Sequence, residues 1–538
     1  MEADAARLAG PTDHAVRGDS PSGVRLAELV AAFSLAIDLG LGQPMEHMLR
    51  AWLIATRLGA HLGLDPEDRR RLFYVVTLAW VGCVADTPVV TALFGDDIAF
   101  RRDSYGVDHA GLPMLGLVLG HAGAGGTALH RLRLATSLAL TGGAAVTRGL
   151  MSHCLTTARM AERLGLDPDV GDALQQVFAR WDGKGVPSSI AGDQLSQPIR
   201  LYHLADSVEV VHRAGGVDAA VDLVRDRRGE QFDPAVVDTF CDVANEVLDG
   251  IDTVADWNAL IDAEPELQQE LSGAELDVAL ETIADFTDLR SPSRTGHSRA
   301  VASLCTGAAA LSGMAEAEST TLRRAALVHD IGLHGVPGSI LDKAGPLTNT
   351  EFERVRMGAY YTGRMLSRPP ALARIGSLAG LVHERLDGSG YPHGLSGAAI
   401  PTAGRVLAAA DVYQAMTEPR AHRPPLGPQV AATALQADAR AGRLDAEAVD
   451  AVLATAGQRR GKRRSGPAGL TGREIEVLVL IARGASNRQV AHTLGISPRT
   501  AGTHIERIYA KIGASTRSTA TLFAMQHGLL DSLEPLDL

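Results

Sequence analysis

Leu327-Val328-His329-Asp330-Ile331-Gly332 is the stretch from which the rest of the chain can be interpreted. It places a histidine directly before an aspartate in an apolar, helix-like run from Ala325 to Ile331. Burying an imidazole beside a carboxylate costs free energy unless a partner compensates both groups. A divalent metal is such a partner, because imidazole and carboxylate both bind first-row transition metals. A hydrogen-bonded core pair is the other interpretation, and the doublet alone does not decide between them.

Length and composition indicate a multidomain, mainly helical protein. The chain has 538 residues, only 4% of them aromatic, and its long segments are rich in alanine and leucine, which favours helices over strands. The cysteines show no CxxC spacing, which argues against a disulfide framework or a zinc knuckle. Residues 1–22 have the composition of a disordered tail. Because we find no signal peptide and no uninterrupted apolar run of membrane-spanning length, we expect a cytoplasmic protein without a membrane partner.

Charge is distributed unevenly along this chain of net charge −12. Residues 456–530 carry 12 Lys and Arg against 3 Asp and Glu, so the preceding body is strongly acidic. A basic C-terminal module on an acidic body indicates that only the C-terminal end meets a polyanion. The first part of the module, 456–467, has the composition of a flexible linker, which is either simply solvated or follows DNA phosphates.

An internal repeat organises the body. Pairs such as His47 and His297 lie 250 positions apart, whereas the run 180–187 matches the run 385–392 at an offset of 205. The change of offset implies about 45 extra residues in the first copy, within the segment 83–152, for which the sequence suggests no role. We therefore predict two copies of one helical unit, 23–255 and 256–455.

The second copy contains an ordered set of candidate metal ligands, namely His297, the His329-Asp330 doublet, His383 and Asp411. This order, with the run His383-Glu384-Arg385-Leu386-Asp387-Gly388-Ser389-Gly390-Tyr391-Pro392, resembles the HD-GYP branch of the HD phosphohydrolase superfamily over about 275–425. The resemblance implies a helical fold, bound iron or manganese, and hydrolysis of cyclic di-GMP or a related phosphodiester. It assigns His297, His329, Asp330 and Asp411 to a first metal and His383 to a second. Asp330 and His383 are then the candidate catalytic residues.

Three positions in the second copy depart from the family pattern. Leu333 stands where the family has a substrate-binding lysine, Gly358-Ala359 replaces a His-Pro pair, and Val382 replaces the first of two adjacent histidines. A misplacement of about 1 Å in an active site costs on the order of 100-fold in rate. The departures therefore favour one metal site over two, and a pocket with weak or lost turnover over an efficient enzyme.

The first copy departs further. Its doublet position is Ala79-Trp80, and Phe178 corresponds to His383, although His47, His153 and Asp206 are kept. Apolar bulk at ligand positions predicts a packed, catalytically silent copy, and a small-molecule sensor pocket is the alternative.

The C-terminal module carries the start signals of three short helices. Thr471 with Glu474 and Ser486 with Gln489 form capping boxes, and Ser497 is an N-cap before a proline. The tight turn 494–497 sets the third helix across the second, which predicts a helix-turn-helix.

Residues 468–533 resemble the LuxR-type (GerE-like) DNA-binding domain. The matching residues are Leu470-Thr471-x-Arg473-Glu474, Ser486-Asn487-x-x-Val490-Ala491-x-x-Leu494-x-Ile496-Ser497 and Thr500-x-x-x-His504-Ile505-x-x-Ile508-x-x-Lys511-Ile512-Gly513. The resemblance implies that the third helix enters the major groove of double-stranded DNA and that the protein binds as a homodimer. The candidate DNA-contacting residues are Arg488, Arg499, Thr500, Thr503, His504, Arg507 and Lys511.

Together these patterns predict an all-α protein with two tandem HD-GYP-like domains followed by a LuxR-type helix-turn-helix domain. The predicted function is a bacterial transcription regulator whose body binds a divalent metal, iron or manganese, and senses or processes a phosphorylated small molecule such as a cyclic dinucleotide. The alternative is an active metal-dependent phosphodiesterase that the head localises on DNA. A third possibility is an interaction scaffold without a metal.

Overall fold

The computed structural model describes residues 23–108, 111–140, 144–254, 256–457 and 467–531. The predicted tail 1–22 and most of the predicted linker 456–467 lie outside the described residues. Helices make up almost all of the regular structure, which confirms the all-α prediction. A short antiparallel pair, β1 (Val24–Arg25) with β2 (Glu270–Leu271), joins the starts of the two copies.

The first copy contains the helices α1 (Leu26–Gly40), α2 (His47–His61), α3 (Pro66–Leu78), α4 (Cys83–Phe94), α5 (Asp97–Ser104), α6 (Gly111–His121), α7 (Ala128–Leu140), α8 (Ala144–Arg163), α9 (Pro168–Leu174), α10 (Gln197–Asp226) and α11 (Pro234–Leu248). Helix α12 (Trp257–Asp262) leads into the second copy. That copy contains α13 (Gly273–Asp288), α14 (His297–Leu311), α15 (Glu316–Val328), α16 (Gly338–Leu341), α17 (Asn349–Leu366), α18 (Ala373–Ala379), α19 (Thr402–Thr417), α20 (Pro428–Arg440) and α21 (Ala446–Gly457).

Equivalent helices of the two copies begin at matching positions. Helices α2 and α14 both begin at the repeated histidine, and α8, α9 and α10 begin 205 residues before α17, α18 and α19. An equivalent hydrogen bond is also repeated. The N–H of Gly82 donates to Oγ1 of Thr157 over 2.9 Å, and that of Gly332 donates to Oγ1 of Thr362 over 3.0 Å. The repeat seen in the sequence is therefore a repeat of structure.

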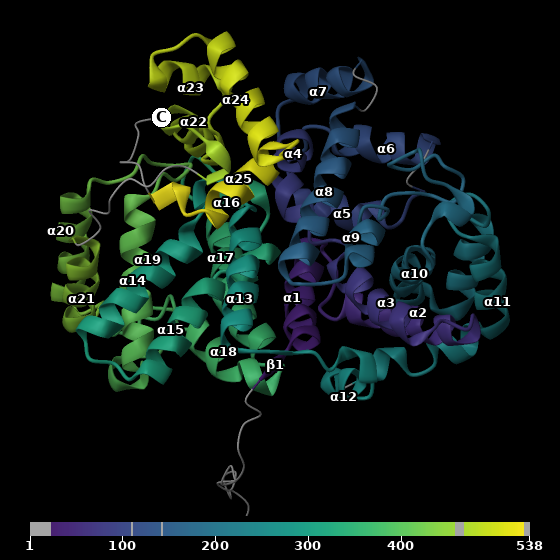
Figure 1. Cartoon of the computed structure of the whole chain (residues 1–538), viewed down its shortest axis with the longest axis horizontal. Helices are drawn as coiled ribbons and strands as arrows, with labels where there is room; N and C mark the ends of the chain where they lie inside the picture. Colours follow the sequence, from purple (N-terminus) through teal and green to yellow (C-terminus); the bar gives the residue numbers. More distant parts are fainter. Residues whose placement is uncertain (1–22, 109–110, 141–143, 255, 458–466, 532–538) are drawn as a thin grey trace, which may run out of the picture.

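The two copies are interlocked through their first helices (Figure 1). Helix α1 packs against α17 and against the 3-10 turn η5 (Ile331–Gly335) of the second copy, whereas α13 packs against α4 and α8 of the first. The Phe33 ring meets the His334 ring edge-on at 5.6 Å between centroids. Buried apolar side chains of both copies and the C-terminal domain form one continuous core. The copies thus share a core.

The His329-Asp330 doublet lies at the end of a helix. Helix α15 ends at Val328, His329 is its C-cap residue, and Asp330 has a non-helical φ of −103° before η5 begins. The prediction of a helical run continuing to Ile331 was therefore wrong. The break turns the side chains of the doublet toward α14 and α19.

The extra segment of the first copy forms α4 to α7. These helices have a small core of their own around Phe94, Ala122 and Leu138. The rings of Phe94 and Phe100 stack at 4.0 Å. The segment that suggested no role in the sequence is thus a folded cap on the first copy.

The segment Pro66–Phe94 is long and apolar enough to cross a membrane by composition, and 83% of its most apolar window is buried inside the protein. It comprises α3 and α4, which lie in the body. A search for uninterrupted apolar runs misses it because charged residues, among them Asp86, interrupt the run. The packing of the protein itself accounts for its apolar character.

The C-terminal domain, called the head below, sits on the body at the junction of the two copies (Figure 1). It contains α22 (Gly472–Ala482), α23 (Asn487–Leu494), α24 (Pro498–Ile512) and α25 (Arg517–Gln526). The side chains of Thr471, Ser486 and Ser497 cap the first three as predicted. The fourth, α25, was not predicted, and it packs against α22 and against α8 and α13 of the body.

Candidate metal centre and DNA-binding surface

Four of the predicted ligands converge on one point between α14, α15 and α19. Nε2 of His297 lies 3.1 Å from Oδ1 of Asp411 and 3.8 Å from Oδ2 of Asp330. Nε2 of His329 lies 3.2 Å from Oδ2 of Asp330 and 3.7 Å from Oδ1 of Asp411. All four residues are buried. Ligand-type atoms of His297, His329 and Asp411 all lie within 4.8 Å of one another, and Asp330 adjoins this group through its contacts with both imidazoles. These four residues are called the ion cluster below.

The orientation of His329 fits a cation bound in the ion cluster. Its Nδ1–H donates to the carbonyl oxygen of Ala326 over 2.7 Å, which leaves the lone pair on Nε2. Burial lowers the pKa of His329, so the ring is neutral. In the described part of the chain no donor reaches this buried Nε2, which faces two carboxylates instead. A lone pair pointing at carboxylates is unfavourable unless a positive charge lies between them.

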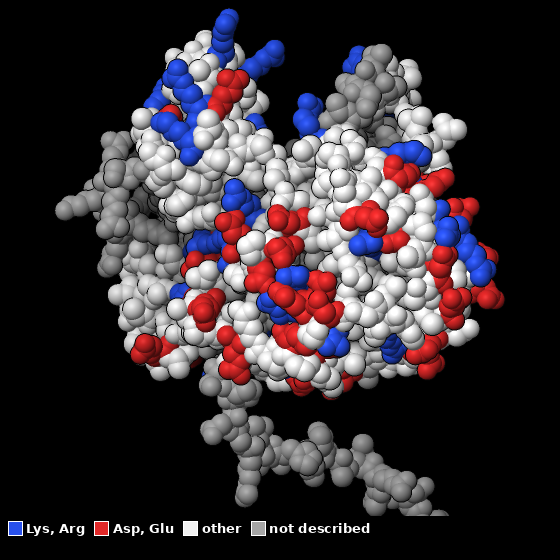
Figure 2. All heavy atoms as spheres, turned by 45° about the vertical axis from the view of Figure 1, so that its right-hand side comes forward, with Lys and Arg blue, Asp and Glu red and all other residues white. Residues whose placement is uncertain are grey.

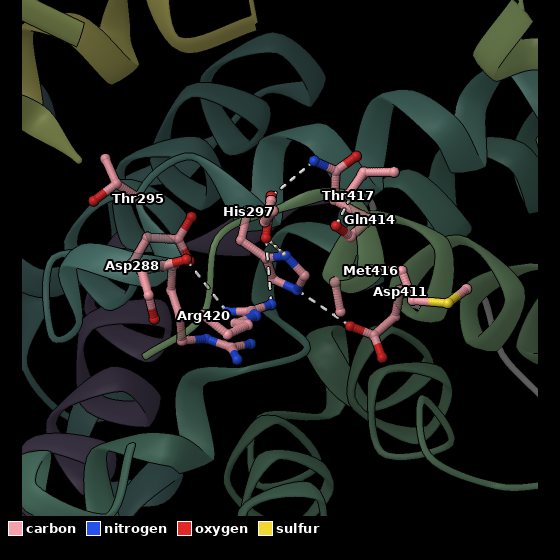
Figure 3. Close-up of polar contacts among 12 residues, drawn as sticks. Asp288, Thr295, His297, Asp411, Gln414, Met416, Thr417 and Arg420 are labelled. Atoms are coloured by element: carbon pink, nitrogen blue, oxygen red, sulfur yellow. Dashed lines mark hydrogen bonds and ion pairs between the residues drawn. The ribbon is translucent and has the colours of Figure 1, made fainter. Parts of the chain in front are cut away.

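His297 is held from its other ring nitrogen, as metal-binding histidines usually are. Nδ1 contacts Oε2 of Glu418 at 2.8 Å while Nε2 contacts Asp411, a contact drawn in Figure 3. Burial opposes a charge on His297, but Glu418 and Asp411 outweigh burial and raise its pKa. Burial likewise opposes the charge on Asp411, but the hydrogen bond from His297 and the charge of that imidazole hold the pKa of Asp411 well below the usual range.

His383 lies at the edge of the cluster. Its Nδ1 is 3.7 Å from Oδ2 of Asp411, the oxygen on the far side of that carboxylate, and its side chain is 21% exposed. Burial lowers its pKa to about 4, so the ring is neutral. The loop that carries it is tied together by the buried Glu384, which accepts hydrogen bonds from the N–H groups of His393 and Leu395 over 2.8 Å each. The structure thus places His383 beside the four-ligand cluster.

Arg294 was missed by sequence reasoning. Its Nη2 contacts Oδ2 of Asp330 in the cluster. Burial, with the nearby Arg420, lowers the pKa of Arg294 to about 10, and the side chain stays charged at neutral pH. The available signal was its position, three residues before His297, but position alone does not reveal that the loop turns inward. The predicted site lacks the family lysine at Leu333, yet it contains this guanidinium.

The first copy has no counterpart of the cluster at its doublet position. Asp206, the equivalent of Asp411, receives hydrogen bonds from His47 at 3.1 Å, from the Trp80 indole at 3.4 Å and from the Tyr105 hydroxyl at 3.3 Å. Nδ1 of His47 contacts Glu209 at 2.5 Å. Donors from the protein therefore compensate the carboxylate that would otherwise need a metal.

His153 joins a different group in the first copy. Ligand-type atoms of Cys83, Asp86 and His153, all buried, lie within 4.8 Å of one another. Asp86 is also bound by Arg101, whose Nη2 lies 2.5 Å from Oδ1. Sequence reasoning kept His153 as a relic of the ligand set but did not predict these neighbours.

The head exposes a basic surface, and Figure 2 shows Lys and Arg side chains projecting from it at the upper left. Of the predicted DNA contacts, His504 is half-buried and the others are exposed, namely Arg488, Arg499, Thr500, Thr503, Arg507 and Lys511. Six of the seven lie on α24 in two helical rows, as a helix entering a groove requires.

Three of these side chains also have partners within the head. Nζ of Lys511 donates to Oε2 of Glu474 over 2.7 Å and to the carbonyl oxygen of Gly469 over 3.1 Å. The hydroxyl of Thr500 contacts the capping Ser497 at 2.8 Å, and that of Thr503 donates to Arg499 O. Lys511 thus fastens the start of α22 to α24.

Two family models match the chain. Residues 281–448 match the HD domain, and residues 468–524 match the bacterial regulatory proteins of the luxR family. The first match contains every residue of the cluster, and the second contains α22 to α24. Both predicted resemblances are confirmed.

Curated relatives extend the comparison over both copies. The chain is 27% identical over 402 residues to 3'3'-cGAMP-specific phosphodiesterase 3 of Vibrio cholerae, covering 74% of this chain and 87% of the relative. It is 34% identical over 192 residues to 3'3'-cGAMP-specific phosphodiesterase 1 of the same organism, covering 35% and 44%. It is 38% identical over 148 residues to the cyclic di-GMP phosphodiesterase of Thermotoga maritima, covering 27% and 40%.

A solved structure shows that the fold of the body is shared. The crystal structure of the cyclic GMP-AMP specific phosphodiesterase V-cGAP3 of V. cholerae matches with a TM-score of 0.58 at 22% identity, covering 81% of this chain and 98% of that one. At this identity the match establishes architecture only. The chain is therefore an HD domain protein of the HD-GYP type that carries a LuxR-family helix-turn-helix domain at its C-terminus.

Proposed function

We propose that the protein is a DNA-binding regulator whose second copy is a metal-dependent phosphodiesterase for a cyclic dinucleotide. The single observation that carries the proposal is the buried lone pair of His329 facing Asp330 and Asp411. The relatives are named as phosphodiesterases of 3'3'-cGAMP or cyclic di-GMP, which supplies the substrate class. This proposal gives more weight to turnover than the interpretation favoured by the sequence, in which the body mainly senses its ligand.

Each side chain of the site has a distinct task in this proposal. His297, His329, Asp330 and Asp411 hold a divalent ion, and Glu418 and the Ala326 carbonyl orient the two imidazoles. The bound ion supplies Lewis-acid chemistry toward a phosphodiester. Arg294 binds a phosphate oxygen with its guanidinium.

His383 completes the site from its edge. A neutral imidazole at 21% exposure is open to ligand and solvent, so it suits proton transfer to or from a reacting oxygen. Leu333, Gly358 and Val382 offer no nitrogen ligands, which favours one ion over two. Slow turnover is expected from a site reduced in this way.

The head is positioned to respond to the site. Oγ1 of Thr295, between Arg294 and the loop end at Gly296, donates to the carbonyl oxygen of Ala482 in α22 over 3.2 Å. Oγ of Ser518 in α25 donates to the carbonyl oxygen of Ala85 in the first copy over 3.0 Å. A ligand that moves the loop before His297 therefore acts directly on the head. Homodimeric binding to double-stranded DNA is part of the proposal, since half-site recognition by one short helix gives little affinity.

The test uses equivalent positions in the two copies. Asp411→Asn and Asp206→Asn change the same carboxylate in the second and first copy. Purified wild-type protein loaded with Mn²⁺ is assayed for metal content and for hydrolysis of 3'3'-cGAMP and cyclic di-GMP. We expect Asp411→Asn to lose both metal and hydrolysis, and Asp206→Asn to keep both.

Other outcomes separate the alternatives. If the wild type bound stoichiometric metal and nucleotide but did not hydrolyse the nucleotide, the result would exclude the phosphodiesterase activity and support a sensing function. Equal metal content in wild type and Asp411→Asn would contradict the proposal that Asp411 belongs to a metal centre.

A further inference from the structure

A cavity lies in the first copy, where its metal site would be. Its volume is about 190 Å³, and it is partly open to solvent. Trp80 and Asp206, the equivalents of Asp330 and Asp411, lie in its wall together with Phe178. The cavity thus lies at the position in the first copy that corresponds to the ion cluster of the second copy.

Most of the cavity wall is apolar and aromatic. The extra segment contributes Val90, Leu93, Phe94 and Phe100, and the part that matches the second copy contributes Phe178. The Trp80 and Phe178 rings meet edge-on at 5.5 Å between centroids. Such walls favour a flat or apolar body of a ligand. The extra segment, absent from the second copy, therefore has the role of enclosing this space.

In the described part of the protein, one buried arginine of the cavity wall makes no direct ion pair. Arg227 is 7% exposed, and its Nη1 donates to Oε1 of Gln231 over 3.0 Å. Among the described residues no carboxylate lies within ion-pair distance of it, whereas Arg101 and Arg180 in the same wall pair with aspartates. Burial lowers the pKa of Arg227. Asp108 and Asp226 act on this guanidinium only from beyond ion-pair distance, and Asp108 is itself paired with Arg180. An anionic ligand in direct contact would therefore reduce the cost of burying the charge of Arg227.

We propose that this cavity binds a small amphipathic organic anion, with its apolar or aromatic body against Phe178 and the extra segment and its acid group on Arg227. The site is separate from the ion cluster and goes beyond the function proposed above. It is an effector site in a copy that has lost its own ligand doublet. The wall also carries Asp86, whose neighbour Ala85 contacts the head.

The proposal is tested on the full-length protein with two probes that differ by one acid group. 1-Anilinonaphthalene-8-sulfonate has a flat apolar body and one negative charge, and N-phenyl-1-naphthylamine is its uncharged counterpart. Fluorescence titrations compare wild type with Arg227→Met and with Arg228→Met. Arg228 is the matched control because it is the adjacent arginine, lies outside the cavity wall and pairs with Asp238 at the surface.

Loss of the guanidinium is expected to weaken binding of the sulfonate about tenfold or more, since hydrogen bonds to charged groups contribute that much affinity. Binding of the uncharged probe is expected to stay the same, and Arg228→Met is expected to leave both probes unaffected. Equal sulfonate affinity in wild type and Arg227→Met would overturn the role of Arg227. Equal losses in Arg227→Met and Arg228→Met would overturn it as well, because the effect would then be one of overall charge.

A second variant fills the cavity without touching its charges. Gly149 of α8 lies in the wall, and a Cβ built there meets no atom within 4 Å. Gly149→Phe is therefore expected to fold normally and to abolish binding of both probes. Gly116→Phe, at an exposed helical glycine with equally open surroundings, is its control and is expected to bind both. Wild-type binding by Gly149→Phe would show that the probes bind elsewhere and would refute the site.

Discussion

Oγ1 of Thr295 lies 3.2 Å from the carbonyl oxygen of Ala482 and shares its one hydrogen between this oxygen and the carbonyl oxygen of Pro292, at 3.0 Å. Thr295 lies two residues before His297, and Ala482 is the last residue of α22. One hydrogen bond therefore joins the loop of the ion cluster to the DNA-binding head. A change of that loop on ion or ligand binding is expected to reach the head in part through this contact, which a single substitution can remove.

Thr295→Val keeps the shape of the side chain and removes this donor. We expect binding of Mn²⁺ to change the affinity for duplex DNA in the wild type, and the variant to lose about 1 kcal/mol of that coupling, or about fivefold in the ratio of affinities. Fluorescence anisotropy with and without chelator, at constant salt, measures the ratio. Thr306→Val is the control, because the hydroxyl of Thr306 donates its hydrogen bond to a carbonyl oxygen within α14. An unchanged ratio in Thr295→Val would exclude this contact as the connection.

Glu418→Gln tests the support of the ion cluster. The carboxylate contacts Nδ1 of His297 at 2.8 Å and favours the ring orientation that points Nε2 inward. Loss of such an outer partner lowers metal affinity by about 10- to 100-fold in known sites, and we expect that range for Mn²⁺ measured by calorimetry. Glu353→Gln, on the exposed face of α17, is expected to bind normally. Normal binding by Glu418→Gln as well would mean that His297 is oriented by its own helix.

The carboxylates around His47 predict a pH-dependent stability of the first copy. Burial opposes the charge, but hydrogen bonds to Asp206 and Glu209 outweigh it and raise the pKa of His47 to about 10. Burial also opposes the charge on Glu209, but His47 and Arg50 lower its pKa to about 2. Protonated His47 therefore stabilises the folded protein, and this contribution is complete below pH 6.5 and is lost as pH rises through 10. Ionised Glu209 likewise stabilises the folded protein above pH 4.5, and this contribution is lost as pH falls toward 2.

His47→Gln should therefore destabilise the protein most between pH 4.5 and 6.5, and its difference from wild type should narrow as pH rises toward 10. Chemical denaturation at a series of pH values measures the difference in free energy of unfolding. A difference that is constant from pH 6 to pH 10 would show that His47 is neutral in the folded protein.

Arg507 and Lys511 were both predicted to bind DNA, and the structure suggests different results for them. Arg507 is exposed on α24, so Arg507→Ala is expected to weaken DNA binding and reduce the salt slope by about 1 without affecting thermal stability. Lys511 pairs with Glu474, whose pKa that contact lowers to about 2. Lys511→Ala is therefore expected to lower the melting temperature of the head. Equal salt slopes for wild type and Arg507→Ala would contradict the docking of α24 on DNA.

Whether a contact in this protein can be predicted from the sequence depends on how far apart the two residues lie along the chain. The capping boxes of α22 and α23 each involve residues three positions apart. The pair Thr471 and Glu474 was therefore predicted from the sequence, and the structure confirms it. The convergence of His297 with Asp411, 114 residues away, was predicted only because a known motif order links them. Nothing in the sequence links Glu418 to His297 or Arg294 to Asp330. Those contacts arise where loops close over the site.

The extra segment shows the same limit. Its residues predict neither a cavity nor its wall, because Phe100 and Phe178 face one space only after α4 to α8 fold against the loop 178–187. The shared core of the two copies is another case. A repeat in the sequence predicts two similar units, but it does not show that α1 packs on the second unit and α13 on the first.

Arg294 gives the sharpest prediction for the ion cluster, and it rests on the proposed function. The guanidinium contacts Oδ2 of Asp330 and so competes with an ion for that oxygen, while its charge attracts a phosphate. Removing the charge is therefore expected to change binding of metal and hydrolysis in opposite directions. Arg294→Met should bind Mn²⁺ at least about tenfold more tightly, because a nearby positive charge is lost. It should hydrolyse a cyclic dinucleotide roughly 10- to 100-fold less efficiently, because a charged hydrogen bond to phosphate is lost.

The control is Arg364→Met, at an exposed arginine of α17 that contacts Tyr360 and is expected to change neither property. Calorimetric titration with Mn²⁺ and an assay of kcat/KM on the same preparations provide the two measurements. If Arg294→Met lost metal affinity and activity together, the arginine would be a structural support of Asp330. If it gained metal affinity and kept full activity, the arginine would be only a stand-in cation, and phosphate would be bound by other groups.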